Sequence, residues 1–219
     1  MFRKSFVLLF LIICISLSLF TSCKNKEDIN ITSEQETLPY LTYNVQIPKY
    51  SDYPEFSKNI RENLEKDFQK YKDFAKSEME CGSSDVLTYR TIFEDYSNKN
   101  YLNVFIKKYI FCGPSMEDEY YITFCWDKEQ KKLLSIEEIT GMTSVQLMDF
   151  CRQYVKAHLK DVEPKARDFV DSCVDLALDE NLKKYSSFVA SKKSVTIHFA
   201  PGDSAPKGYG PQTVEIKLK

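Results

Sequence analysis

The chain has 219 residues, of which 43% are hydrophobic and 28% are charged, and its formal net charge is −2. This composition is that of a globular protein, and the mildly acidic balance argues against a nucleic-acid partner. With only six glycines, the sequence offers no glycine-rich phosphate loop.

The first 22 residues are typical of a secretory leader. Arg3 and Lys4 supply positive charge, and residues 6–20 form an uninterrupted apolar run. This run is shorter than the roughly 20 residues that a membrane-spanning helix needs. Residues 1–22 are therefore predicted to be a signal peptide.

The end of the leader, residues 19–23, reads Leu-Phe-Thr-Ser-Cys and resembles a bacterial lipobox, with Phe20 where Leu is usual. The resemblance implies that Cys23 receives a lipid, becomes the first mature residue and makes the membrane a partner of the chain. An ordinary secretory signal that happens to contain a cysteine is the alternative. We expect a lipid-anchored cell-envelope protein, on the outer membrane or the periplasmic face of the inner membrane. Surface exposure stays open, and Lys24 slightly favours the outer membrane.

After Cys23 the sequence stays polar and charged until about residue 38. Such a composition predicts a disordered tether over residues 23–38. The remaining residues, 39–219, are numerous enough for one domain with its own core. We therefore expect a leader, a lipidated tether and a single folded domain.

The first half of the folded part alternates between strands and one long helix. Apolar residues alternate with polar ones over residues 41–47, which indicates a strand. Pro54 then opens a predicted helix with one apolar stripe. That stripe consists of Phe56, Ile60, Leu64, Phe68, Tyr71 and Ala75. Residues 86–96, 101–111 and 120–126 read as three strands with short connections, and hence as an antiparallel meander.

The second half is predicted to hold two helices followed by two strands. Thr143 and Gln146 have the spacing of a capping box at a helix start. Pro164 begins a further helix, whose apolar stripe is Phe169, Cys173, Leu176 and Ala177. The strands cover residues 195–199 and 214–218. The order predicts an α+β fold, an antiparallel β-sheet with helices packed on one face.

Two stretches of the sequence are similar to a known family. Residues 126–139 (WDKEQKKLLSIEEI) and the closing stretch, residues 196–216, resemble the bacterial extracytoplasmic domain called DUF3298. This domain forms the C-terminal part of lysozyme-binding anti-sigma factors of the RsiV type and accompanies some peptidoglycan deacetylases. The resemblance covers roughly residues 40–219. It implies a binding module of the cell envelope, with a lysozyme-like protein or peptidoglycan as ligand.

The sequence departs from this family at two places. The central hairpin carries Cys112, Gly113, Pro114 and Ser115, without the histidine that family members often have there. Gly202 and Asp203 stand where an aromatic residue is common. The sensing role of the anti-sigma factors does not carry over either, because a lipid anchor alone cannot pass a signal across a membrane.

The loop at residues 200–211 is the best candidate for a ligand site. It holds three of the six glycines and two prolines, and it carries Asp203, Lys207 and Tyr209. A charged pair beside a tyrosine suits an interface, because tyrosine combines a large apolar area with a polar tip. The alternative is a connection that prolines and glycines merely shape.

Other residues give no support to catalysis, a metal or a cofactor. His158 and His198 are isolated, and the acids at 117–119 and 137–138 suit a turn and a helix start. No C-x-x-C pair occurs, so a zinc site is not predicted. The disulfide connectivity stays open among Cys81, Cys112, Cys125, Cys151 and Cys173.

The sequence thus favours a binding domain over an enzyme. Two alternatives stay open. One is a peptidoglycan hydrolase or deacetylase, which would need ligand-spaced histidines or acids. The other is a structural lipoprotein that helps to assemble the envelope, which an exposed apolar patch would favour.

Overall fold

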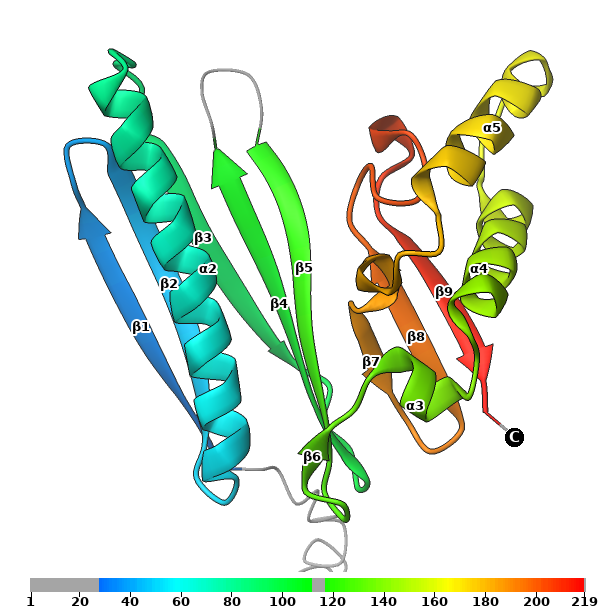
Figure 1. The fold of residues 1–219 in the computed structure, drawn as a ribbon, viewed down its shortest axis with the longest axis horizontal. Coiled ribbons are helices and arrows are strands. Elements are labelled where there is room, and N and C mark those ends of the chain that lie inside the picture. Colours follow the sequence, from blue (N-terminus) through cyan, green and yellow to red (C-terminus); the bar gives the residue numbers. More distant parts are fainter. Residues whose placement is uncertain (1–27, 112–116, 219) are drawn as a thin grey trace, which may run out of the picture.

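The computed structural model describes residues 28–111 and 117–218. Helices and antiparallel strands are both abundant in it, so the predicted α+β class is confirmed. The strands form two sheets, however, and not the one sheet that was expected. Figure 1 shows the sheets side by side, with α2 on the outer side of one and α4 and α5 on the outer side of the other.

The first sheet has six strands in sequence order. They are β1 (Ile29–Thr37), β2 (Leu41–Tyr50), β3 (Leu87–Asp95), β4 (Tyr101–Phe111), β5 (Glu117–Asp127) and β6 (Lys132–Leu133). All neighbours are antiparallel except β2 and β3, which run parallel. The parallel pair requires a crossover connection, and the long helix between these two strands supplies it.

Helix α2 (Pro54–Glu80) makes this crossover and covers the sheet. Its 27 residues extend about 40 Å at 1.5 Å per residue. Proline stands in its first turn, where a missing N–H costs nothing. The predicted stripe is the buried face, and each fully buried apolar side chain contributes about 1.5–3 kcal/mol. Its buried apolar members are Phe56, Ile60, Leu64, Tyr71 and Ala75.

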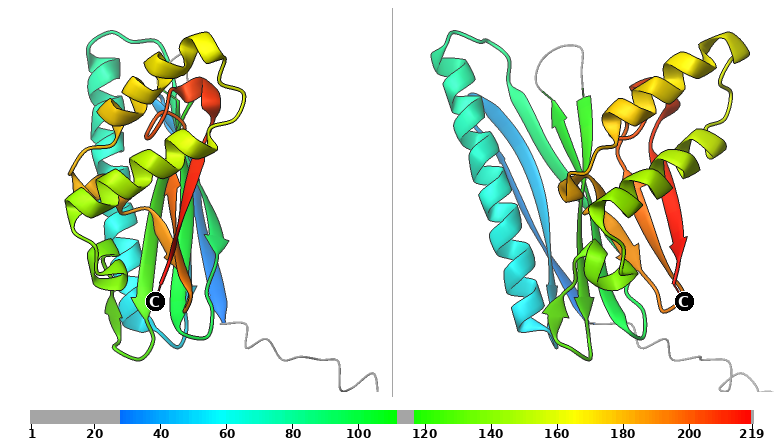
Figure 2. Two further views of the ribbon diagram at one scale, coloured as in Figure 1. Left: turned by 90° about the vertical axis from the view of Figure 1, so that its right-hand side faces the viewer. Right: turned by 45° about the vertical axis from the view of Figure 1, so that its right-hand side comes forward.

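The second sheet has three antiparallel strands, which residues 140–180 cover with helices on one side. The strands are β7 (Phe188–Ala190), β8 (Ser194–Phe199) and β9 (Gln212–Lys217). The helices are α3 (Ile136–Thr140), α4 (Ser144–His158) and α5 (Arg167–Ala177), with short 3-10 turns η1 (Pro164–Ala166), η2 (Leu182–Tyr185) and η3 (Lys207–Tyr209). Figure 2 shows α4 and α5 stacked over the side of this sheet that faces away from α2.

Capping boxes begin α3 and α4. At α4, the Thr143 side chain accepts from the Gln146 N–H and the Gln146 side chain accepts from the Thr143 N–H, as predicted. Ser135 and Glu138 make the same reciprocal pair at α3. Each box satisfies two N–H groups that a helix start otherwise leaves unpaired.

Side chains of β8 divide between the two sides of its sheet. Val195, Ile197 and Phe199 are buried against the helices. His198 points the other way and packs its ring 4.7 Å from that of Phe105 on β4. The second sheet therefore lies between its own helices and the face of the first sheet that α2 leaves uncovered.

The predicted tether is wrong over residues 29–37, because these residues form β1. Each residue of β1 pairs with β2, from Ile29 opposite Tyr50 to Thr37 opposite Thr42. Eight of its nine side chains are exposed, so the strand lacks the apolar alternation by which a strand is recognised. Backbone pairing alone places it at the sheet edge, and the folded part begins before residue 39.

The apolar stripe predicted for α5 is also wrong. Phe169 and Leu176 are 70% and 81% exposed, whereas Val170 and Val174 are buried. The two sets have the same helical spacing, one residue apart. Only the direction from which the sheet approaches decides between them.

Both apolar clusters draw only on residues from Ile29 onward. Residues 28–218 thus contain both described cores, and neither core uses the leader. Cys23 and the signal peptide lie outside the described residues. Within residues 28–111 and 117–218, no helix has the length and apolarity that crossing a membrane demands.

Candidate functional site

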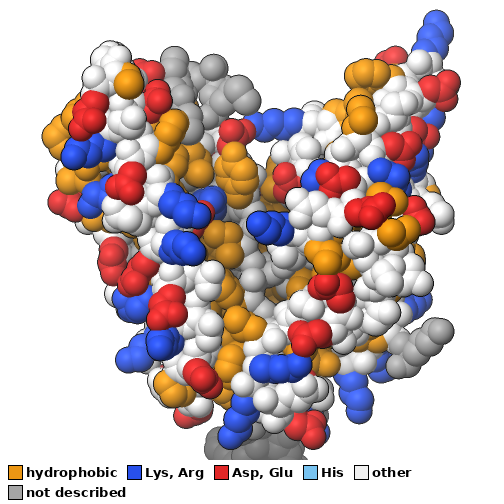
Figure 3. All heavy atoms as spheres, in the orientation of Figure 1, with side chains coloured by type: hydrophobic (Ala, Val, Ile, Leu, Met, Phe, Trp, Pro, Cys, Tyr) orange, Lys and Arg blue, Asp and Glu red, His pale blue; other side chains and the backbone are white. Residues whose placement is uncertain are grey.

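A groove separates the end of β5 from the second sheet and its helices. Figure 3 shows the molecule hollowed between the part that carries α2 and the part that carries α4 and α5, with hydrophobic side chains along the hollow. Two compartments lie along this groove, with volumes of about 400 Å³ and about 320 Å³. Lys183 and Ser186 line both compartments, so the two adjoin.

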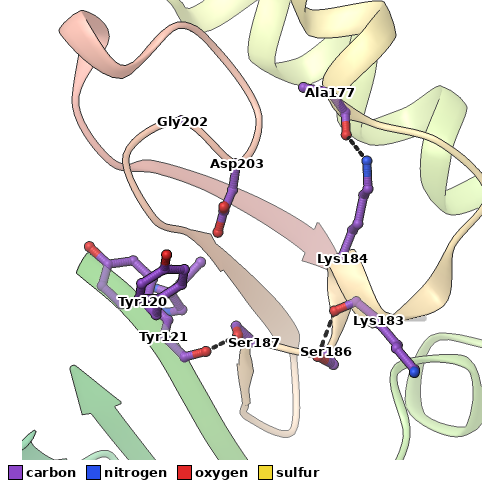
Figure 4. Close-up of a pocket in the computed structure, with 10 residues that line it drawn as sticks. Tyr120, Tyr121, Ala177, Lys183, Lys184, Ser186, Ser187, Gly202 and Asp203 are labelled. Atoms are coloured by element: carbon purple, nitrogen blue, oxygen red, sulfur yellow. Dashed lines mark hydrogen bonds between the residues drawn. The ribbon is translucent and has the colours of Figure 1, made fainter. Parts of the chain in front are cut away.

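The larger one, called here the polar compartment, is built from four segments. Tyr120 and Tyr121 come from β5, and His198 comes from β8. The other described residues that line it are Ala177, Lys183, Lys184, Ser186, Ser187, Gly202 and Asp203. Its volume lies in the range of small-molecule sites. Figure 4 shows Asp203 reaching down from its loop toward the space between Tyr121 and Lys184.

Hydrogen bonds across the groove hold the walls of the polar compartment in place. The Ser187 hydroxyl donates to the Tyr121 carbonyl oxygen at 2.9 Å, which ties the second sheet to β5. The Phe188 N–H donates to the Thr123 hydroxyl at 2.8 Å. Lys184 donates to the Ala177 carbonyl oxygen and pairs with Asp179 at 3.0 Å. The compartment is therefore preformed and does not depend on a ligand for its shape.

Asp203 is the only acid among the described residues that line the polar compartment. Its carboxylate accepts the Ala200 N–H at 3.2 Å. Burial raises the pKa of this carboxyl above its ordinary value, against the opposing effect of that hydrogen bond. Gly202 makes the turn possible, because its φ of +98° is one that other residues rarely adopt.

His198 forms the inner wall of the polar compartment. Burial lowers its pKa below 6.5, so the ring is neutral at pH 7. Its Nε2 atom is buried without a hydrogen-bond partner among the described residues. The ring packs against Phe105, and its main contribution to the site is an aromatic surface.

The smaller one, called here the apolar compartment, lies beside β6 and α3. Its apolar lining consists of Phe124, Cys125, Leu133, Leu134, Ile136, Leu182 and Phe188. Thr123, Ser135, Glu137, Lys183 and Ser186 complete the described lining. Burial raises the pKa of the Cys125 thiol to about 12, so it is an apolar group here and not a nucleophile.

The three predicted ligand residues are not brought together. Asp203 lines the polar compartment. Lys207 instead pairs with Asp118 at 2.7 Å, which joins the loop to the start of β5. Tyr209 packs against the apolar cluster under α4 and α5, and its carbonyl oxygen accepts from Gln212. The loop thus contributes one wall of the site through Asp203, while the other two residues support it.

Sequence reasoning missed most of the site. Tyr121, Ser187 and Lys183 come from segments 60 or more residues apart in the chain, and no motif links them. One signal was available, because Gly202 and Asp203 mark a departure from the resembled family and both line the polar compartment.

The other candidate groups have structural roles or lie apart from the groove. His158 accepts from or donates to the Tyr154 carbonyl oxygen at 2.8 Å on an exposed face of α4, and not on the apolar face where it was expected. The acids at 117–119 belong to β5 and not to a turn. Within residues 28–111 and 117–218, no cluster of three metal-ligating side chains occurs. Cys81, Cys125, Cys151 and Cys173 are free thiols, and Cys112 lies outside the described residues.

Comparison with solved structures identifies the fold. A DUF3298 family protein from Pseudomonas aeruginosa PAO1 superposes with a TM-score of 0.63 at 11% identity, covering 87% of this chain and 90% of that one. A DUF3298 family member from Bacteroides fragilis NCTC 9343 gives a TM-score of 0.56 at 17% identity, covering 88% and 90%. The chain therefore has the fold of the structures solved for this family.

The sequence match is narrower than the structural one. Residues 140–219 match the family described as "Protein of unknown function (DUF3298)". This range holds α4, α5 and the second sheet, together with the closing stretch on which the resemblance partly rested. It supplies every wall of the polar compartment except β5. No protein with a curated description matches the chain.

Proposed function

We propose that this chain is a bacterial cell-envelope lipoprotein whose folded part binds a saccharide of the peptidoglycan type in the polar compartment and leaves it chemically unchanged. The carrying observation is the lining of that compartment. Tyrosine rings offer flat apolar surfaces to the C–H faces of a sugar, while serine, lysine and Asp203 offer donors and acceptors to its hydroxyls.

A binding role fits the composition of the compartment better than hydrolysis. Glycosidases use a pair of carboxyl groups on opposite sides of the scissile bond. Asp203 has no second acid among the described lining residues. Glu117 and Asp118 stand outside the lining and pair with Arg90 and Lys207.

Attachment through Cys23 would keep the groove close to the envelope. The described chain begins at Asp28, whose carbonyl and carboxylate oxygens accept from the N–H and hydroxyl of Ser51. Four residues separate Cys23 from Asp28, and a fully extended chain spans about 17 Å over that interval. The folded part would therefore stay near the lipid headgroups.

Calorimetry of residues 24–219 with a purified disaccharide muropeptide tests the proposal. We expect saturable binding that Asp203→Asn weakens about tenfold, because a hydrogen bond to a charged group is worth about 1.5–3 kcal/mol. Asp161→Asn, a change of the same type at an exposed loop residue, should leave the affinity unchanged.

Two other outcomes would overturn parts of the proposal. Binding of lysozyme without binding of the muropeptide would replace the saccharide by the protein ligand that the family resemblance implies. Release of a cleaved or deacetylated product from the muropeptide would replace binding by catalysis.

A further inference from the structure

The second compartment points to the class of ligand. We infer that the groove binds a saccharide that carries an apolar chain, with the sugar in the polar compartment and the chain in the apolar compartment. This inference rests on the function proposed above and assigns a role to the apolar compartment, which that function leaves unused.

The first support is the change of character along one groove. The polar compartment presents hydroxyl, ammonium and carboxyl groups, whereas seven apolar side chains line its neighbour. A hydroxyl-rich sugar gains nothing from such an apolar wall. A hydrocarbon chain gains its transfer from water, which strengthens binding about threefold to fourfold for each methylene that is fully buried.

The second support is the way in which the compartments join. Lys183 and Ser186 line both of them, so a ligand leaving the polar compartment meets the apolar one directly. Figure 4 shows the Lys183 side chain pointing away from Asp203, which leaves the Asp203 side of the polar compartment to the sugar. The junction therefore suits the bond between a sugar and its chain.

The third support is the position of the apolar compartment in the molecule. It is lined by β6 and the start of α3, at the same end of the structure at which the described chain begins (Figure 1). With a lipid on Cys23, this end would face the membrane. A chain drawn from the lipid layer would reach the apolar compartment first, and its sugar would lie farther from the membrane.

Alkyl glycosides of increasing length test the inference. Residues 24–219 would be titrated by calorimetry with the methyl, hexyl and octyl N-acetyl-β-D-glucosaminides, each below the concentration at which it forms micelles. We expect the octyl compound to bind at least tenfold more tightly than the methyl compound. Leu134→Asn and Leu182→Asn should each reduce this ratio to below threefold.

Leu176→Asn is the matched control, because Leu176 is 81% exposed on α5 and lies outside both compartments. It should leave the chain-length ratio unchanged. Methyl NMR provides a measurement that needs no variant. The octyl compound should shift the signals of Leu134, Ile136 and Leu182, and the methyl compound should not.

The outcomes separate this inference from the proposed function. Equal affinities for the three glycosides would overturn the apolar chain and leave saccharide binding in place. Chain-length dependence that Leu176→Asn abolishes would move the chain to α5 and overturn the assignment. Failure of all three glycosides and of the muropeptide would overturn both proposals.

Discussion

Asn103 on β4 and Ala190 on β7 form a reciprocal hydrogen-bonded pair that joins the two sheets. The Asn103 side chain donates to the Ala190 carbonyl oxygen at 2.9 Å and accepts the Ala190 N–H at 2.8 Å. Both residues are buried, so the asparagine amide takes the place of a neighbouring strand for a backbone that has none there. The groove exists because this contact fixes the second sheet against β4 and β5.

Replacing Asn103 by Ala should destabilise the protein by about 2–3 kcal/mol. The Ala190 N–H would lose its acceptor inside the protein, while its carbonyl oxygen would keep the Asn98 donor at 2.7 Å. Urea unfolding followed by circular dichroism measures the change. Asn63→Ala, on the exposed face of α2, should cost less than 0.5 kcal/mol. Equal effects of the two changes would show that the pair does not hold the sheets together.

His198 should make the stability depend on pH below neutrality. Its pKa is lowered in the folded state, so the unfolded chain binds the proton more readily. The corresponding stability is fully present above about pH 6.5 and is lost as the pH falls toward the folded-state pKa.

Unfolding free energies at pH 7.5 and pH 5.5 test this dependence. The wild type should lose more stability over that interval than His198→Phe, which keeps an aromatic ring against Phe105 and removes the titrating group. His158→Gln, at an exposed residue, should behave as the wild type. The same slope in His198→Phe as in the wild type would assign the pH dependence to other groups.

The two apolar stripes of α5 should differ sharply in their effect on stability. Val174 is fully buried, and Val174→Ala should cost about 2 kcal/mol through lost burial and the cavity that remains. Leu176→Ala removes a larger group from an exposed face and should change the stability by less than 0.5 kcal/mol. Thermal or urea unfolding of the two variants decides. The reverse order would mean that α5 packs through its other face.

Cys23 should carry the lipid in the cell. Metabolic labelling with a palmitate analogue should tag the full chain and should fail for Cys23→Ala. Cys81→Ala is the control, because Cys81 is an exposed free cysteine in the folded part. Equal labelling of Cys23→Ala and the wild type would reject the anchor, and with it the membrane orientation on which the third support for the glycolipid depends.

Local sequence determined the elements whose signals lie close together in the chain. The stripe of α2, the capping box at Thr143 and Gln146, and the three meander strands were predicted because each depends on residues within a few positions of one another. The α+β class follows from their order. The leader and its cysteine are also local patterns.

Tertiary structure alone decided the strand β1, the buried face of α5 and the site. β1 has almost no apolar side chains to announce it and is held by backbone pairing to β2. The faces of α5 have equal spacing, so the packing direction of the sheet chose between them. The walls of the polar compartment, from Tyr121 to Asp203, meet only because two sheets dock, and docking depends on shape and buried hydrogen bonds between segments that are distant in the sequence.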